Sequence, residues 1–212
     1  MFRAWPRWLG PVEVLPVQLP GRENRMREPH FGTYEALADS AAEDLAPYLD
    51  RPYGVFGHCG GALPAFEAVR RFEERGLRSA DRCFVSSQVA PQDGPFGGFL
   101  GMSQLELREK LMTLLAALGS KDPAEDLIDM VLEVLEADLA ANRAYRIEVP
   151  RRMRTPITAI GWDADRDVPH ALMTGWNAWA PTDSVVLPGH HYSFLDPPTI
   201  LLELLEEGTT RP

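Results

Sequence analysis

Short apolar runs alternate along the chain with longer segments in which apolar residues recur at every third or fourth position. A short run rich in β-branched residues is typical of a strand, whereas the longer spacing is typical of an amphipathic helix. The runs that predict strands are Glu13–Leu19, Tyr53–Phe56, Arg82–Val89, Ile157–Gly161 and Ser184–Leu187. Strands that alternate with helices predict a mostly parallel sheet covered by helices on both faces.

Helical spacing follows most of the predicted strands. Thr33 can cap the first helix, whose apolar stripe extends to Leu49, and Gly76 ends the helix that follows the second strand. The remaining segments with this spacing lie near residues 171–180 and 199–206. Together with the strands, these helices predict an α/β fold.

The middle of the chain breaks this alternation with two consecutive helices. Ser103 and Glu106 form a capping box, and leucines at helical spacing follow them. A second helix begins near Pro123, a residue that suits the first helical position. We therefore expect a helical lid over about residues 100–148, inserted into a single domain that spans residues 1–212.

Composition and charge restrict the function classes. The chain has 212 residues, of which 45% are hydrophobic and 25% are charged, as in an ordinary globular protein. A formal net charge of -10 argues against nonspecific nucleic-acid binding. The chain has only two cysteines, and it shows neither the apolar run of a signal peptide nor one of membrane-spanning length. We therefore expect a cytoplasmic monomer without a disulfide framework and without a nucleic-acid or membrane partner.

A glycine-rich turn, GHCGG, lies between the second predicted strand and the helix after it. In a nucleophile elbow the nucleophile occupies a strained strand-to-helix turn, and glycines two positions before and after it, here Gly57 and Gly61, avoid side-chain collisions. A helix N-terminus activates a thiol, so Cys59 is the predicted nucleophile. The backbone N–H of Gly60 is the expected oxyanion donor. Cys83 lies within a predicted strand, without flanking glycines, and is expected in the core.

A histidine base is expected after the last predicted strand. In folds built around such an elbow, the chain order is nucleophile, acid and histidine, with the last two on loops after late strands. His190 and His191 follow the strand Ser184–Leu187, and we select His191 as the base. Two adjacent histidines have poor spacing for a metal ion, so we expect no metal site. The other histidines lack this position and are expected to be structural or exposed: His30, His58 and His170.

The loop after the strand Ile157–Gly161 contains three aspartates, one of which would orient the histidine. Asp165 is the preferred acid because Asp165-x-x-Val168 has the form of a loop that turns into a helix. Asp163 remains an alternative, and Asp167 is a weaker one. A run of acidic residues in a loop is also explained by simple solvation.

These motifs resemble the type II thioesterases of polyketide and nonribosomal peptide biosynthesis, a family with an α/β-hydrolase fold. The resemblance implies hydrolysis of acyl groups from the phosphopantetheine arm of an acyl- or peptidyl-carrier protein, with no cofactor held by the enzyme itself. It also implies a catalytic triad of Cys59, Asp165 and His191. The matching segments are VQLPGRENRMREP, PYGVFGHCGGALPAFE, FVSSQVAP, the loop at Asp165 and LPGHHYSFL.

The chain departs from the family pattern at three places. Cys59 stands where the family usually has serine, and Gly60 replaces a common methionine, which loosens the turn. Family members also have an apolar strand and a glycine-rich loop that supplies a second oxyanion donor, whereas this chain begins with the stretch after that loop. We therefore expect a missing sheet strand between Glu13–Leu19 and Tyr53–Phe56, and a natural coding sequence that continues upstream of Met1.

Three functions are compatible with these residues, in this order of preference. A hydrolase would pass the acyl group from Cys59 to water, whereas an acyltransferase would pass it to a second carrier, because an acyl-cysteine is itself a thioester. The third is an inactive, truncated remnant that still binds a carrier protein. Arg22, Arg25 and Arg27 are candidates for docking an acidic carrier, although a solvated loop is the better explanation for each of them taken singly.

Overall fold

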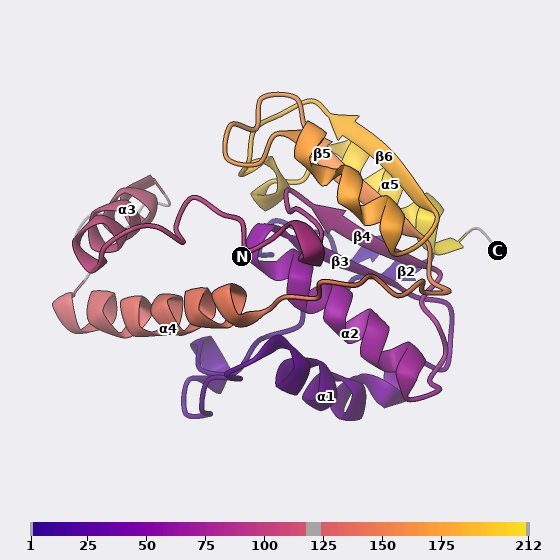
Figure 1. Cartoon of the computed structure of the whole chain (residues 1–212), viewed down its shortest axis with the longest axis horizontal. Coiled ribbons are helices and arrows are strands. Elements are labelled where there is room, and N and C mark those ends of the chain that lie inside the picture. The colour runs from indigo at the N-terminus through magenta and orange to yellow at the C-terminus, as the bar shows by residue number, and fades with distance from the viewer. Residues whose placement is uncertain (1, 118–123, 211–212) are drawn as a thin grey trace.

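The computed structural model describes residues 2–117 and 124–210, and its centre is a four-stranded parallel sheet (Figure 1). The strands lie side by side in chain order: β3 (Gly54–His58), β4 (Arg82–Ser86), β5 (Ile157–Trp162) and β6 (Thr182–Leu187). Each strand runs parallel to the one before it, so the four carboxyl ends lie at one edge of the sheet. The predicted parallel α/β architecture is therefore confirmed, and the loops that leave these ends meet at one place.

Helices cover both faces of this sheet. On one face, α1 (Tyr34–Leu45) packs on α2 (Ala62–Glu74), and α2 contacts β3 and β4. On the other face lies α5 (Thr199–Thr210) (Figure 1). The segment expected as a helix near residues 171–180 is a 3-10 helix, η5 (His170–Ala178). Gly175 in its middle disfavours a regular α-helix.

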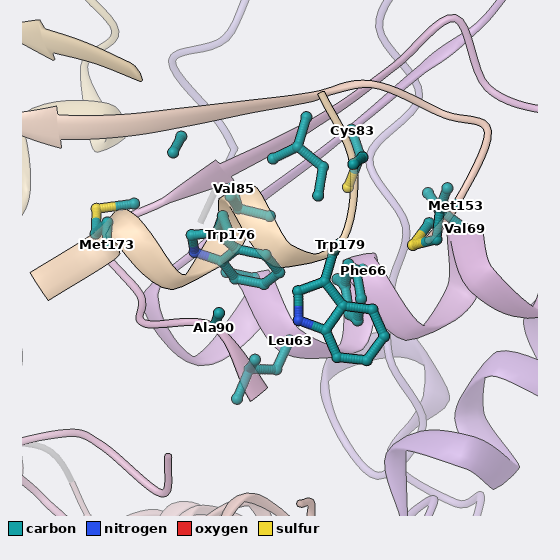
Figure 2. Close-up of a cluster of buried hydrophobic side chains, with 14 of the residues drawn as sticks. Leu63, Phe66, Val69, Cys83, Val85, Ala90, Met153, Met173, Trp176 and Trp179 are labelled. Carbon is teal, nitrogen blue, oxygen red and sulfur yellow. The ribbon is translucent and has the colours of Figure 1, made fainter. Parts of the chain in front are cut away.

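Alternate residues of β4 face two different core layers. Phe84 lies in the layer beneath α5 together with Leu201. Cys83 lies in the layer beneath α2 with an exposed fraction of 0%, which confirms that it is a core residue. Other members of this layer come from α2, from β4, and from η5 and the residue after it: Leu63, Phe66, Val85, Trp176 and Trp179 (Figure 2).

The prediction of a strand over Glu13–Leu19 is wrong in the length of the strand. Only β2 (Val12–Glu13) is a strand, and it pairs antiparallel with β1 (Trp8–Leu9) outside the main sheet. Pro16 has no N–H to contribute to a ladder, and Leu15 and Val17 on either side of it are 52% and 51% exposed, so the strand does not continue there. Within the described residues, β3 is therefore an edge strand of the four-stranded sheet.

The N-terminal residues pack against β3 and against the loop after β6. The centroid of the Trp5 ring lies 5.2 Å from that of Phe56 in β3, and the Trp5 Nε1–H donates to the backbone oxygen of Phe194 at 2.8 Å. Phe2 contacts Trp5 edge to face at 5.1 Å. The first residues of the chain therefore hold in place the segment around Phe194, three residues after His191.

The two consecutive helices predicted in the middle of the chain are α3 (Gln104–Ala117) and α4 (Glu125–Ala144), which extend away from the sheet (Figure 1). The capping box is present, because the backbone N–H of Ser103 donates to Glu106 Oε2 at 2.7 Å and that of Glu106 donates to Ser103 Oγ at 3.4 Å. The expected start at Pro123 lies outside the described residues. Among the residues that the structure describes, no helix combines the length and the apolar character needed to cross a membrane.

Candidate active site

The chain turns sharply from β3 into α2 at Cys59. The φ angle of Cys59 is +49°, in the left-handed region that non-glycine residues rarely adopt, and one 3-10 turn (Cys59–Gly61) leads into the helix. A strained strand-to-helix turn of this kind lifts the nucleophile above the carboxyl edge of the sheet. Cys59 is only partly buried, so its thiol is accessible. The backbone therefore has the geometry that the sequence motif predicts.

The glycines of this turn differ in their steric role. A Cβ on Gly57 would lie 2.3 Å from the backbone oxygen of Gly61 and 2.7 Å from the Cα of Ala62, so only glycine fits at residue 57. Gly61 was expected to be needed for the same reason, but a Cβ there would meet nothing within 4 Å. Gly60 also has open space around it, and it directly follows Cys59, as its predicted role of oxyanion donor requires.

His191 and Asp165 come from the loops after β6 and β5. His191 Nδ1 lies 2.9 Å from Asp165 Oδ2, and the Cys59 side chain is close enough to influence the pKa of the same imidazole. Burial lowers the pKa of His191, but the hydrogen bonds and charges of Cys59 and Asp165 outweigh burial and raise this pKa to about 9. The protonated imidazole is therefore favoured at neutral pH. The structure brings together the three residues preferred from the sequence.

Hydrogen-bond donors surround the Asp165 carboxylate. Its Oδ1 accepts from the backbone N–H groups of Asp167 at 2.8 Å and Val168 at 3.0 Å. Its Oδ2 accepts from His191 and from the hydroxyl of Ser87 at 2.7 Å. Burial raises the pKa of Asp165, but these donors keep the pKa below its usual value. Ser87 was not identified from the sequence, where the one available signal is a polar Ser-Ser pair at the end of a buried strand.

The alternative acid and base candidates make other contacts. Asp163 Oδ1 accepts from the backbone N–H of Gly189 at 2.9 Å and so shapes the loop that carries the histidines. Asp167 is exposed and contributes its backbone N–H to the neighbouring carboxylate. His190 is exposed, and its Nδ1 accepts from the backbone N–H of Tyr192 at 3.2 Å. This geometry favours Asp165 and His191 over their neighbours.

His58 is buried directly beside the site, between two aromatic rings. It stacks on Phe194 at 3.9 Å between ring centroids and meets His191 edge to face at 4.8 Å. Its Nδ1 lies 2.9 Å from Ser86 Oγ. Burial, aided by the charge of His191, lowers the pKa of His58 to about 3, so this ring is neutral. His58 therefore supports the His191 ring without competing for its proton.

One group of side chains has the composition of a metal site. Asp165, Asp167 and His191 present ligand atoms within 4.8 Å of one another. The facing atoms of Asp165 and His191 are hydrogen-bonded to each other, and Asp165 Oδ1 is occupied by backbone N–H groups. These donors suit a hydrogen-bonded acid and base better than a coordination sphere, and the expected absence of a metal stays a prediction.

The three arginines considered for carrier docking have different surroundings. Arg22 forms a two-pronged ion pair with Asp138 of α4 at 2.8 and 3.0 Å, and Arg25 pairs with Glu28 at 2.6 and 2.8 Å. Arg27 is exposed, and the described part of the chain shows no ion pair for it. Two of the three therefore hold contacts within the chain, and Arg27 keeps its charge available to a partner.

A parallel sheet with a strained turn after one strand, and with an acid and a histidine at the ends of later strands, is the arrangement of an α/β-hydrolase. Residues 1–208 match the thioesterase domain family, and the chain belongs to this family. The predicted fold class and family are thereby confirmed.

Several proteins are similar to the chain, and two of them are solved thioesterases. Linear gramicidin dehydrogenase LgrE from Brevibacillus parabrevis is 31% identical over 214 residues, which cover 97% of this chain and 81% of LgrE. The solved thioesterase RedJ, from the prodiginine pathway in Streptomyces coelicolor, is 34% identical with a TM-score of 0.77 and covers 98% of this chain and 79% of its own. The type II thioesterase BorB from the borrelidin cluster is 30% identical with a TM-score of 0.78, over 93% of this chain and 81% of its own. The chain is an enzyme that acts on thioesters.

Replacing Gly57 by alanine should damage the elbow, because the added Cβ has no space against Gly61 and Ala62. Overpacking of this kind costs about 1–3 kcal/mol of unfolding free energy, and a chain of this size loses roughly 2–4 °C of melting temperature per kcal/mol. Gly61→Ala is the matched control and should melt close to the unaltered protein. Thermal unfolding followed by circular dichroism compares the two, and equal melting temperatures would contradict the steric argument.

Asp165→Asn should slow thioester hydrolysis far more than Asp163→Asn does. An amide at residue 165 offers His191 a donor where an acceptor is needed, which leaves the imidazole in the wrong tautomer and costs up to about 10⁴-fold in the best-studied triad. An amide at residue 163 can still accept the Gly189 N–H through its oxygen. The measurement is steady-state hydrolysis of an acyl-pantetheine, and a larger loss in Asp163→Asn would transfer the role of acid to Asp163.

Proposed function

We propose that this protein hydrolyses acyl groups from the phosphopantetheine arm of carrier proteins in polyketide or nonribosomal peptide biosynthesis. The observation that supports this proposal most directly is the hydrogen bond between His191 and Asp165, in loops at the same edge of the sheet as the strained turn that carries Cys59. The pathways of the relatives point the same way, since LgrE, RedJ and BorB are named for linear gramicidin, prodiginine and borrelidin. Carrier-bound thioesters are the substrates that unite such pathways with a thioesterase.

In the first half-reaction, the Cys59 sulfur attacks the carbonyl carbon of the carrier-bound thioester. The thiolate is the attacking form, and the protonated imidazole of His191 beside it stabilises that charge. The carbonyl oxygen becomes an oxyanion that the Gly60 N–H is expected to bind. The bond to the phosphopantetheine sulfur then breaks, and His191 gives its proton to that sulfur. The products are an acyl-Cys59 thioester and a free carrier thiol.

In the second half-reaction, water resolves the acyl-enzyme. The neutral His191 takes a proton from the water molecule while the water oxygen attacks the acyl carbon. The bond to the Cys59 sulfur breaks, the carboxylic acid leaves, and the thiolate and the protonated imidazole are restored. Asp165 holds the Nδ1–H of His191 throughout, so Nε2 stays directed at the reacting atoms.

Transfer of the acyl group to a second carrier is the alternative that the cysteine favours. An acyl-Cys59 is a thioester, so its exchange with another phosphopantetheine thiol conserves the bond type and is nearly isoenergetic. An acyl-serine is an oxyester, from which the return to a thioester is uphill. The position of Cys59 in the elbow is therefore compatible with both water and a thiol as acceptor, and the family membership favours water.

Cys59→Ala should abolish acyl release from acyl-pantetheine and acyl-carrier substrates, because loss of a covalent nucleophile typically lowers turnover by several orders of magnitude. Cys83→Ala is the control and should keep most of the activity. Cys83 is completely buried, and burial raises the pKa of its thiol to about 12. Intact-mass measurements should find the acyl adduct on Cys59. An adduct on Cys83, or full turnover by Cys59→Ala, would overturn the assignment.

A labelled acyl group distinguishes hydrolysis from transfer. One carrier is loaded with a radiolabelled acyl group, and the protein is added together with a second holo-carrier. Free labelled acid is the expected main product. Label that accumulates on the second carrier, and does so only when Cys59 is present, would make acyl transfer the function instead.

A further inference from the structure

Ser87, directly after β4, is strained in the same way as the candidate nucleophile. Its φ angle is +49°, and its exposed fraction is 0%. Glycine adopts this left-handed conformation with the least strain. The conformation is fixed on both sides, because the Ser87 N–H donates to the oxygen of Ile160 at 3.0 Å and the oxygen of Gln88 accepts from Trp176 Nε1 at 2.8 Å. Ser87 thus adopts a conformation that glycine would adopt with less strain, and the contacts of its side chain indicate why a serine is present.

The hydroxyl of Ser87 contacts the acid of the site. Its Oγ lies 2.7 Å from Asp165 Oδ2, which is the same oxygen that faces His191 Nδ1 at 2.9 Å. Because the ionised carboxylate can only accept, the Ser87 O–H is the donor. The bond joins the end of β4 to the loop after β5 and is completely enclosed.

We propose that Ser87 is a positioning residue that fixes Asp165 against His191 and limits the negative charge that Oδ2 presents to the imidazole. This inference rests on the proposed catalytic role of these two residues. Two backbone N–H groups donate to Oδ1, and the Ser87 hydroxyl donates to Oδ2, so both carboxylate oxygens are held by hydrogen bonds. Sharing Oδ2 keeps the imidazole aligned while it remains able to release its proton to the leaving thiol, which a more basic imidazole does less readily.

Two substitutions at this residue separate the hydrogen bond from the strain. Ser87→Ala removes the hydroxyl and keeps the strain, whereas Ser87→Gly removes both. Both variants should lose about 10-fold in kcat for acyl-pantetheine hydrolysis, the size expected for one hydrogen bond to a charged group. The glycine variant should melt at a higher temperature than the alanine variant, because glycine suits the left-handed backbone. If the alanine variant does not fold, the glycine variant alone tests the loss of activity.

The pKa of His191, measured from its ring carbon signals by NMR, is the readout that a merely structural role would not change. In Ser87→Ala the undivided charge of Oδ2 should raise this pKa above its value of about 9. The matched control is Ser184→Ala, which removes a hydroxyl 2.8 Å from His170 Nε2, away from the site, and should leave the His191 pKa unchanged. In an Asp165→Asn background, Ser87→Ala should add no further loss of kcat, because its effect passes through the carboxylate.

An unchanged or lowered His191 pKa in Ser87→Ala would overturn the proposal, as would full kcat in both variants. An additional 10-fold loss in the Asp165→Asn background would also overturn it, since Ser87 would then act by another route. The NMR measurement needs no substrate. A failure of the proposed thioesterase function would therefore appear as absent turnover in the unaltered protein, while the pKa comparison would still decide the role of Ser87.

Discussion

The buried carboxylate of Asp165 is the interaction on which the geometry of the site depends. Its side chain is 0% exposed, and an enclosed charge is tolerated only when donors compensate for the lost water. The donors come from three places in the chain: Ser87 after β4, the loop that follows β5, and His191 after β6. One ion thus fixes the relative positions of three strand ends. The parallel sheet brings those ends to one edge, so the hydrogen bonds of the single Asp165 carboxylate can reach all three of them.

Two of the three described non-glycine residues with a left-handed backbone lie at neighbouring strand ends, Cys59 after β3 and Ser87 after β4, whereas the third, Glu23, lies in the N-terminal part of the chain. Left-handed conformations of non-glycine residues cost of order 1–3 kcal/mol each, which is large for a domain of marginal stability. The layer beneath α2 offsets this strain, since Phe66, Trp176 and Trp179 are almost completely buried there (Figure 2). Trp176 also holds the residue after Ser87 by its Nε1–H. Rigid packing therefore maintains the two strained positions that the chemistry needs.

The order of elements and the elbow were predictable because both depend on local pattern, a run of apolar residues or a glycine two positions from Cys59. The acid was only a preference, since three aspartates lie in one loop and the decision depends on which carboxylate receives the backbone N–H groups of its own turn. Arg22 was considered for docking because it lies in a basic loop. Its ion pair with Asp138 was not predicted, since the two residues lie 116 positions apart and the local sequence pattern gives no information at that separation. Ser87 was not predicted to belong to the site, because two adjacent serines at a strand end do not indicate that one of them has a positive φ angle.

Two imidazoles in edge-to-face contact, those of His58 and His191, have pKa values displaced in opposite directions, to about 3 and to about 9. Both rings are buried, and burial lowers both pKa values. The difference arises from their partners, because the Cys59 side chain and the Asp165 carboxylate raise the pKa of His191, whereas His58 has the neutral hydroxyl of Ser86 and the ring of Phe194. Groups whose surroundings separate their pKa values in this way identify the acid and base of a site. The proposed mechanism therefore assigns the transferred proton to His191, and the neutral His58 packs against that ring without adding a second positive charge beside it.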